Sequence, residues 1–369
     1  MRFLCASVSL CLCVFLLVTP SVLSHETLTT TVLFDREIVR ILNKHCVMCH
    51  VENGPSFPLE TYEQAWLQGR QIRSGIIARH MPPWSAVLGY GQFINDNSLT
   101  LRETQFLVSW VEGLGPRNAG TVFTNVVDSG APRVQVRAKA DFGHSQLGQP
   151  NLMRQIEPMT IEAVQGNTIK RSVLDLGLTA ERRIRALEYM PGDRRVVRAA
   201  FFTIQETGQW IGSWTPWYGF VEFPASAAIR LPAGSHIAAE IHYRGAKERV
   251  VERGTLGLFF ADKPTPNTLS DLVLEAKSAA GSNRFHAEIR LAADITAVAL
   301  RPEISGGVKS VEVSARRLDG GTEVLLFAKD IPTDWPTPYI FKEPVLLRRG
   351  TVVSVTAYDG PVKLTLSRY

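Results

Sequence analysis

The spacing of apolar residues differs between the first third of the chain and the remainder. Apolar residues recur at helical intervals over Phe34–Lys44 and again over Phe106–Leu114. The second stretch follows Thr100 and Glu103, whose spacing forms a capping box and predicts the start of a helix. The pattern therefore predicts a small all-α domain before residue 119. Two shorter helices are expected within it, over Leu59–Leu67 and Gln71–Arg79.

Short strand-like runs separated by turn residues replace this pattern from about Ala131. The Gly, Pro, Asn and Ser content of Gly115–Gly130 predicts a linker ahead of them. A break near Ala261–Thr268 divides the runs into two sets, and many short strands at this spacing are typical of β-sandwiches. The expected strands are Arg183–Tyr189, Arg195–Ile204, Ala228–Leu231, His236–Tyr243 and Thr255–Phe260 in the first set, then Asp271–Leu274, Phe285–Leu291, Ile295–Leu300, Ser310–Ala315, Glu323–Phe327, Tyr339–Val345 and Thr351–Tyr358 in the second.

The candidate chemistry begins with Cys46-Val47-Met48-Cys49-His50. Two cysteines separated by two residues and followed at once by histidine form the attachment signature of c-type haem. Each sulfur adds to one haem vinyl group, and the histidine becomes the proximal iron ligand. A thioredoxin-like redox pair does not need the histidine, and a zinc site needs further ligands, whereas no cysteine follows Cys49. The motif therefore favours one covalently bound haem c.

The second iron ligand is expected in the segment Arg79–Trp84. Met81 follows His50 by 31 residues (81 − 50), which is enough chain for a loop and two short helices around a porphyrin edge. Ligation by His and Met fills both axial positions and raises the reduction potential, which suits electron transfer rather than oxygen binding. His80 is the alternative ligand, in which case Met81 is a packing residue.

Several motifs occur in a fixed order over residues 33–118. They are His45-Cys-x-x-Cys-His50, Gly54-Pro55-x-Phe57-Pro58-Leu59-x-Thr61-Tyr62, Met81-Pro-Pro-Trp84, Asp96-x-x-Leu99-Thr100 and Trp110. This stretch resembles the cytochrome c domain that precedes ascorbate-dependent type II copper monooxygenase-like domains in bacterial secreted proteins. The resemblance implies His50 and Met81 as axial ligands and covalent haem on Cys46 and Cys49.

Resemblance to small cytochromes also suggests a partner for the proximal histidine ring. A backbone carbonyl that accepts a hydrogen bond from this ring would fix its orientation, and Pro55 is the candidate. Trp84 and Trp110 are candidates for packing near the porphyrin, with ordinary core packing as the alternative.

The second half of the chain, over about residues 170–360, carries weaker motifs. They are Met190-Pro-Gly192, Trp214-x-Pro216, Leu231-Pro-x-Gly234, Ile241-His242-Tyr243, Gly257-Leu-Phe-Phe260, Trp335-Pro-x-x-Tyr339 and Gly350-Thr351. This region resembles the copper monooxygenase-like domain related to peptidylglycine monooxygenase. The resemblance implies two jelly-roll-like β-sandwiches, each of which holds one copper in the family.

Departures from that family concern the copper ligands. The family has paired histidines where this chain has Val197-Arg198-Ala199-Ala200, and it has His-Tyr-His where this chain has His242-Tyr243-Arg244. Its second His-x-His position falls in Arg301–Gly306, which contains no histidine, and the end of the chain is short relative to the family. A type II copper needs several imidazole or thioether ligands at one point. Because His144, His236, His242 and His286 are widely scattered, copper is not expected at either site.

The N-terminus adds an expectation about location. Arg2, the apolar run Leu4–Val18 and the small-residue exit Val22–Ser24 predict a signal peptide over residues 1–24, with an uncleaved anchor as the alternative. The first three of the five cysteines lie inside this signal, so the mature chain keeps only Cys46 and Cys49. The protein is therefore expected to be periplasmic or secreted, without a disulfide framework and without membrane association beyond the export signal.

The charge of the chain restricts its partners only weakly. The formal net charge is +5, and the basic residues are scattered rather than gathered in a run, so no nucleic-acid partner is expected. The pairs Arg182-Arg183 and Arg194-Arg195 are interpreted as solvated strand faces. No acid–base pair or nucleophile triad suggests catalysis by the β-region.

These observations together predict a multidomain protein. The expected parts are the signal peptide 1–24, a cytochrome c domain 25–118, a linker 119–130, a first β-sandwich 131–264 and a second, truncated β-sandwich 265–369. The leading functional hypothesis is a monohaem c-type cytochrome that passes electrons to a partner protein, with a copper-less monooxygenase-like scaffold. The alternatives are an active copper monooxygenase fed by the haem, and a haem-based sensor or binding module.

Overall fold

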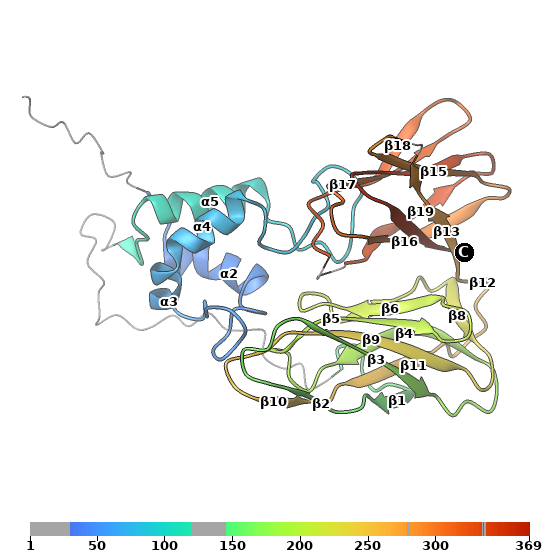
Figure 1. Ribbon diagram of the computed structural model, residues 1–369, viewed down its shortest axis with the longest axis horizontal. Helices are drawn as coiled ribbons and strands as arrows, with labels where there is room; N and C mark the ends of the chain where they lie inside the picture. Colours follow the sequence, from blue (N-terminus) through green and yellow to red (C-terminus); the bar gives the residue numbers. More distant parts are fainter. Residues whose placement is uncertain (1–29, 120–144, 279–280, 334, 336) are drawn as a thin grey trace, which may run out of the picture.

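The computed structural model describes residues 30–119, 145–278, 281–333, 335 and 337–369. Within these residues the chain is mostly β-sheet, with a group of short helices near its beginning (Figure 1). The predicted predominance of β-structure is therefore confirmed. The signal peptide, the expected linker apart from its first residue, and His144 lie outside the described residues.

The helical module, residues 30–117, contains the helices that the sequence predicts. They are a π-helical turn η1 (Phe34–Ile38), α2 (Val39–His45), α3 (Tyr62–Leu67), α4 (Gly69–Ile77) and α5 (Leu101–Glu112). Thr61 and Thr100 each start a helix through a complete capping box, which satisfies N–H groups that the first turn leaves without partners. The module's core packs around Trp110, whose indole N–H donates to the carbonyl of Pro116 at 3.0 Å. Trp110 thus has the ordinary core role that the sequence left open.

The first sandwich consists of two sheets around one apolar core, antiparallel except for the parallel pairing of β12 with β8. One sheet joins β1 (Leu152–Gln155), β11 (Thr255–Phe260), β4 (Arg182–Met190), β8 (Ala227–Leu231) and β12 (Asn267–Thr268), with β7 (Phe220–Glu222) also paired to β4. The other joins β3 (Thr168–Asp175), β9 (His236–Tyr243), β5 (Val197–Ile204) and β6 (Trp210–Trp214), and a separate ribbon pairs β2 (Met159–Ile161) with β10 (Val250–Glu252). Because β12 pairs with β8, the first sandwich extends past the boundary expected at residue 264.

The second sandwich begins at Ser270. Its first sheet joins β13 (Ser270–Glu275), β21 (Val362–Arg368), β16 (Ile295–Ile304) and β19 (Tyr339–Leu347). Its second sheet joins β14 (Lys277–Ser278), β15 (Arg284–Arg290), β20 (Val352–Tyr358), β17 (Ser310–Arg316) and β18 (Thr322–Lys329). In β17, residues alternate between buried and more exposed positions, as expected for a strand with one solvated face.

The segment between α4 and α5 leaves the helices and joins the second sandwich (Figure 1). Ala86 bridges to Ala328 in β18, and Phe93 bridges to Phe341 in β19. Trp84 packs between Phe93 and Tyr339, with ring centroids 6.0 and 5.2 Å away. Trp84 therefore belongs to the core of the second sandwich, which is the ordinary packing role that the sequence left open.

Asn95 lies where the three parts of the molecule meet. Its side-chain amide donates to the carbonyl of Pro338 at 2.7 Å and accepts from the N–H of Ile340 at 3.1 Å. Its own carbonyl accepts from the indole N–H of Trp217, in the first sandwich, at 3.1 Å. Asn95 is 2 % exposed, so these bonds form a buried joint beside the cavity described next.

Among the described helices, none has the length and apolar character needed to cross a membrane.

Candidate functional site

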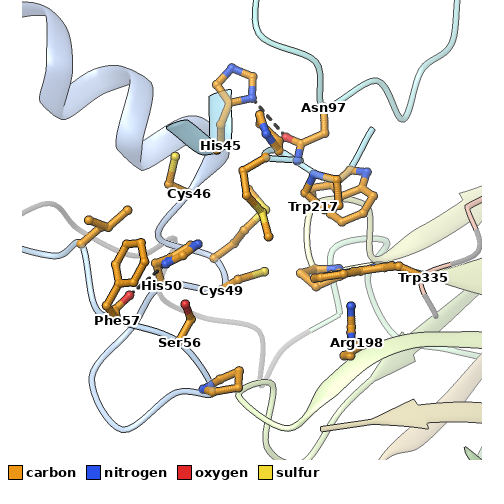
Figure 2. A pocket seen from close by; sticks show the side chains of 18 of the residues that line it. His45, Cys46, Cys49, His50, Ser56, Phe57, Asn97, Arg198, Trp217 and Trp335 are labelled. Carbon is orange, nitrogen blue, oxygen red and sulfur yellow. Dashed lines mark hydrogen bonds between the residues drawn. The ribbon is translucent and has the colours of Figure 1, made fainter. Parts of the chain in front are cut away.

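One cavity brings together the four residues that the sequence selects. Cys46, Cys49, His50 and Met81 all line it, between the helical module and the β-region (Figure 2). The space between its lining atoms is about 1020 Å³, part of it open to solvent. One wall comes from the end of α2, the following loop and α4, and the other comes from both sandwiches. The helical module and both sandwiches therefore all contribute residues to the cavity.

The two cysteines are presented by a tight turn at the end of α2. Cys46 ends the helix, and the N–H groups of Cys49 and His50 both donate to its carbonyl at 3.0 Å. Burial raises the pKa of Cys46 to about 12 and that of Cys49 to about 11, although the nearby Arg194 and Arg198 lower the latter. A reactive redox dithiol needs a lowered thiol pKa, so this environment does not favour the thioredoxin-like alternative.

The His50 ring is oriented by a backbone carbonyl. Its Nδ1 donates to the carbonyl oxygen of Phe57 at 2.9 Å, and the two rings pack with centroids 4.8 Å apart. This bond leaves Nε2 as the nitrogen that can bind a metal. Burial lowers the pKa of His50, and the positive charge of Arg244 adds to this effect against the bond to Phe57. A neutral imidazole, the form that binds iron, is therefore favoured at neutral pH.

The partner of the His50 ring corrects the sequence expectation. Pro55 was the candidate carbonyl, and it lines the cavity, but the carbonyl that accepts the bond belongs to Phe57. The loop places the acceptor two residues later than the motif suggested. Sequence spacing alone does not show which carbonyl of a loop turns inward.

Met81 and His80 differ in position. Met81 lines the cavity and His80 does not, although both side chains are exposed. Both backbone N–H groups bond to the carbonyl of Gly75, at 3.3 and 2.9 Å, so the end of α4 holds this pair in place. The placement favours Met81 over His80 as the second ligand, and ligation itself stays a prediction.

His45 also lines the cavity, but both of its ring nitrogens already have partners. Nδ1 bonds to Oδ1 of Asn97 at 3.1 Å, and Nε2 bonds to Oε1 of Glu103 at 3.3 Å. Glu103 is in turn the capping residue of α5. His45 therefore has a structural role, and it fixes Asn97 at the rim of the cavity.

The wall opposite the cysteines is one that the sequence did not indicate. Arg194, Arg198 and Arg244 of the first sandwich line it, together with Trp217 and with Trp335 of the second sandwich. Figure 2 shows Trp335 and Arg198 across the cavity from Cys49. The Arg198 guanidinium lies 4.2 Å from the centre of the Trp335 ring, which is a cation–π contact.

A β-bulge presents Arg198 to the cavity. In the pairing of β5 with β9, Val197 faces Tyr243 and Ala199 faces His242, so Arg198 is the additional residue. A bulge re-aims a side chain from its regular alternation, and such irregularities concentrate next to functional sites. The Arg198 side chain is further held by a bond to Oδ1 of Asn167 at 2.9 Å.

The Arg194-Arg195 pair corrects another expectation, because it is not a solvated strand face. Arg194 lines the cavity, donates to the carbonyl of Pro216 at 2.7 Å, and lies 5.9 Å from the ring centre of Trp214. Burial lowers its pKa to about 10. Arg195 also lines the cavity, but its guanidinium is ion-paired with Asp193 and Glu248. The pair is therefore part of the site.

A buried carboxylate holds the turn that carries these arginines. Glu252 is fully buried and accepts bonds from the hydroxyls of Tyr189 and Tyr243 and from the N–H of Gly192, at 3.3, 2.9 and 2.9 Å. Gly192 lies in the loop between β4 and β5, and a Cβ there would come within 2.6 Å of the carbonyl oxygen of Arg253. This packing fixes the loop just before Arg194.

The described histidines of the β-region do not gather. His242 bonds to Glu240 at 2.8 Å, His236 bonds to Glu206 at 2.8 Å, and His286 bonds to Thr356 at 3.0 Å. Among the described residues, no group of three or more His, Cys, Asp or Glu side chains could hold a metal ion. In this part of the chain, each of these histidines has a local structural partner.

The lining residues fit a haem c. The two cysteines and the oriented His50 stand on one wall, and the cavity is mainly apolar around them. Two buried N–H donors on its lining have no partner in the described structure, namely Nδ2 of Asn97 and Nε1 of Trp335. Buried polar groups normally have a hydrogen-bond partner, so these donors suit a bound group that carries acceptors.

Comparisons with known proteins add little to this site. No family model and no curated protein matches the chain. Solved structures that share some likeness include the PBSX exported protein XepA, at 8 % identity and a TM-score of 0.19, over 63 % of this chain and 99 % of that one.

Two further structures come from viral particles. The PBCV-1 protein VP54, fitted into a reconstruction of the virophage Sputnik, has 8 % identity and a TM-score of 0.19 over 59 % of this chain and 93 % of that one. A triple jelly-roll protein of an archaeal virus has 11 % identity and a TM-score of 0.14, over 57 % of this chain and 59 % of that one. We base no argument on likenesses at these TM-scores.

Proposed function

We propose that this chain is an exported monohaem c-type cytochrome that transfers electrons to or from a partner protein in the periplasm or outside the cell. The observation that carries the proposal is the common placement of Cys46, Cys49, His50 and Met81 on one cavity. A haem c held there supplies a one-electron Fe(III)/Fe(II) couple. The β-region is then a jelly-roll-like, copper-less scaffold derived from a monooxygenase-like ancestor.

The residues of the chain divide the work of holding such a haem. Cys46 and Cys49 would attach it through thioether bonds, and His50 would offer Nε2 to the iron, while the carbonyl of Phe57 fixes the His50 ring. Met81 offers a thioether from the end of α4. A methionine ligand raises the potential and closes the second axial position, which favours electron transfer over oxygen binding.

The burial of the site also fits electron transfer. The helical module covers the motif on one side, and both sandwiches cover it on the other. A buried site limits water access and reorganisation around a redox centre, since the second shell controls solvent access and redox potential. No nucleic acid and no membrane are included as partners in this proposal.

Elemental analysis tests the proposal directly. The full chain with its signal is expressed in an exporting bacterial host that matures c-type haem, and then offered copper. We expect about one iron and no copper per chain, with haem that stays attached after denaturation in acidic acetone, by reason of the two thioether bonds. The Cys46→Ala/Cys49→Ala double variant is the control and should lose its haem under the same extraction.

Three outcomes contradict the proposal. Haem that extracts from the unaltered chain shows that the motif does not attach it. One or two tightly held coppers per chain would make the monooxygenase alternative the leading function. Binding of carbon monoxide by the reduced chain without displacement of a methionine would favour the sensor.

A further inference from the structure

We propose that the β-region completes the haem site, with Arg194, Arg198 and Arg244 binding the two propionate carboxylates of the haem. This inference rests on the proposed function and assigns to the sandwiches a role that the haem motif does not contain. In this arrangement, the haem contacts the helical module and both sandwiches. This arrangement also makes the sandwich arginines determinants of the reduction potential.

The charge of the cavity carries the first part of the argument. Its described titratable and charged lining residues, apart from the two cysteines, are His45, His50, Arg194, Arg195, Arg198 and Arg244, and no Asp or Glu is among them. Arg195 is ion-paired with Asp193 and Glu248, and His45 is held by Asn97 and Glu103. Arg194, Arg198 and Arg244 line the cavity as well, and all three come from the first sandwich, so this sandwich makes one wall of the cavity cationic.

The chemistry of these groups selects a carboxylate ligand. Guanidinium groups bind carboxylates through paired, charge-assisted hydrogen bonds, and they remain charged when partly buried. Haem carries its two propionate carboxylates on the two pyrrole rings that have no vinyl group, so they lie away from the vinyl positions that Cys46 and Cys49 would engage. Arg198 faces Cys49 across the cavity (Figure 2), and Arg194 and Arg244 line the same cavity.

Two further donors support the same ligand. Asn97 is 4 % exposed and Trp335 is 8 % exposed, and each has an N–H on the cavity lining that finds no partner among the described residues. Trp335 lies against Arg198, so one carboxylate can accept from both side chains. Arg198 is itself only 8 % exposed, so its guanidinium is largely inaccessible to a protein that docks from outside.

The redox consequence follows from electrostatics. Ionised propionates stabilise ferric over ferrous iron, and guanidinium groups beside them offset that negative charge. Removal of two guanidinium groups should therefore lower the equilibrium constant for reduction, by roughly tenfold for a partly buried site. It should also let the propionates titrate at higher pH, because a nearby cation holds a carboxyl pKa down.

Redox titration between pH 5 and pH 8 tests this inference on the full, haem-loaded chain. The variants are R194Q, R198Q, R244Q and R198Q/R244Q. In the double variant, we expect the equilibrium constant for reduction at pH 7 to fall roughly tenfold against a fixed mediator. That constant should also decrease as pH rises, whereas it should change little with pH in the unaltered chain.

Two controls separate this role from general loss of structure. R198K keeps the positive charge, so its reduction potential should lie closer to that of the unaltered chain than the potential of R198Q does. R230Q removes an arginine that is ion-paired with Glu181 on the outside of the same sandwich, and it should match the unaltered chain at every pH. If the double variant does not accumulate, the equilibrium constant for reduction should still fall in each single variant, by a smaller factor.

The results distinguish the two proposals. Covalent haem with an unchanged equilibrium constant and pH profile in all arginine variants overturns this inference and leaves the cytochrome intact. Haem that is not retained by the unaltered chain overturns the proposed function itself. An equilibrium constant that falls as far in R198K as in R198Q would show that the charge at this position does not act on the haem, which also contradicts this inference.

Discussion

The two walls of the cavity differ in how their residues are distributed along the chain. On the helical wall, Cys46, Cys49, His50 and Phe57 lie within a dozen residues, and a single turn and loop position them. On the β wall, Arg194 before β5 and Arg198 within β5 line the cavity together with Arg244 and Trp335, which lie far away in sequence. The first wall is a local motif, and the second exists only through long-range strand pairing.

This difference indicates which structural elements haem attachment and the tuning of its reduction potential each depend on. The helical wall can present its ligands once α2 and the following loop have formed, since the bonds that shape it are local. The β wall needs the pairing of β5 with β9 and the contact between the two sandwiches. Attachment of haem and tuning of haem are therefore predicted to be separable by mutation.

The largest expected effect comes from Met81 on the helical wall. M81A removes the proposed thioether ligand and should abolish the six-coordinate His/Met spectrum of the loaded chain, while covalent haem is retained. The reduced M81A chain should then bind carbon monoxide, since one axial position is open. Absorption spectra of the oxidised and reduced chains measure this.

H80A is the matched control, because His80 is adjacent in sequence but exposed and outside the cavity lining. Its spectrum should match that of the unaltered chain. If H80A changes the spectrum and M81A does not, the ligand assignment is reversed.

Trp84 tests the boundary between the helical module and the second sandwich. Although its sequence position is inside the cytochrome-like stretch, its ring is buried against Phe93 and Tyr339 in the second sandwich. W84A should cost about 3–5 kcal/mol of the free energy of unfolding, the usual range for loss of a large buried aromatic side chain. The cost should appear in the denaturant unfolding of the β-region, with little change in haem absorption before unfolding.

Trp66 provides the comparison for that variant, since it is 45 % exposed on the helical module. W66A should change the free energy of unfolding by less than about 1 kcal/mol. If W84A changes the haem spectrum while the β-region keeps its full stability, Trp84 supports the helical module and not the second sandwich.

The sequence was most informative where structure is local. The capping boxes at Thr61 and Thr100, the helix before Cys46 and strands such as β9 and β11 follow from spacing and turn chemistry within a few residues. By contrast, β3, β6 and β21 were not predicted. The buried, nearly continuous apolar character of β6 gives no alternation to recognise.

The candidate site divides in the same way. The haem motif, Met81 and its advantage over His80 came from sequence, whereas the acceptor at Phe57 replaced Pro55. Arg198 could not be predicted, because a bulge created by pairing with a distant strand presents it. The sequence of a basic pair such as Arg194-Arg195 does not show whether the pair lies on a solvated face or lines a cavity. Only tertiary packing distinguishes the two positions.

Glu103 offers the smallest effect and a test of how local the helical wall is. Burial alone would raise its pKa, but the backbone N–H and hydroxyl of Thr100 and the Lys44 ammonium bond to its carboxylate and lower the pKa to about 2. An acid with a lowered folded-state pKa stabilises the fold above its ordinary pKa near 4.3, and this stabilisation is lost as pH falls through about 2. E103Q should therefore lower the free energy of unfolding by about 1 kcal/mol at pH 7, discounted for its partial exposure, and by much less near pH 2.

Denaturant unfolding at pH 7, pH 4 and pH 2.5 measures this dependence, with haem circular dichroism as the signal. E112Q is the control, because Glu112 forms a more exposed ion pair with Arg73, and its effect should stay below about 0.5 kcal/mol at pH 7. Because Glu103 also bonds to His45, which holds Asn97 on the cavity, E103Q should shift the haem signal slightly before unfolding begins. An E103Q chain as stable as the unaltered one at pH 7 would show that the capping network does not support the helical wall, and that packing around Trp110 alone is sufficient.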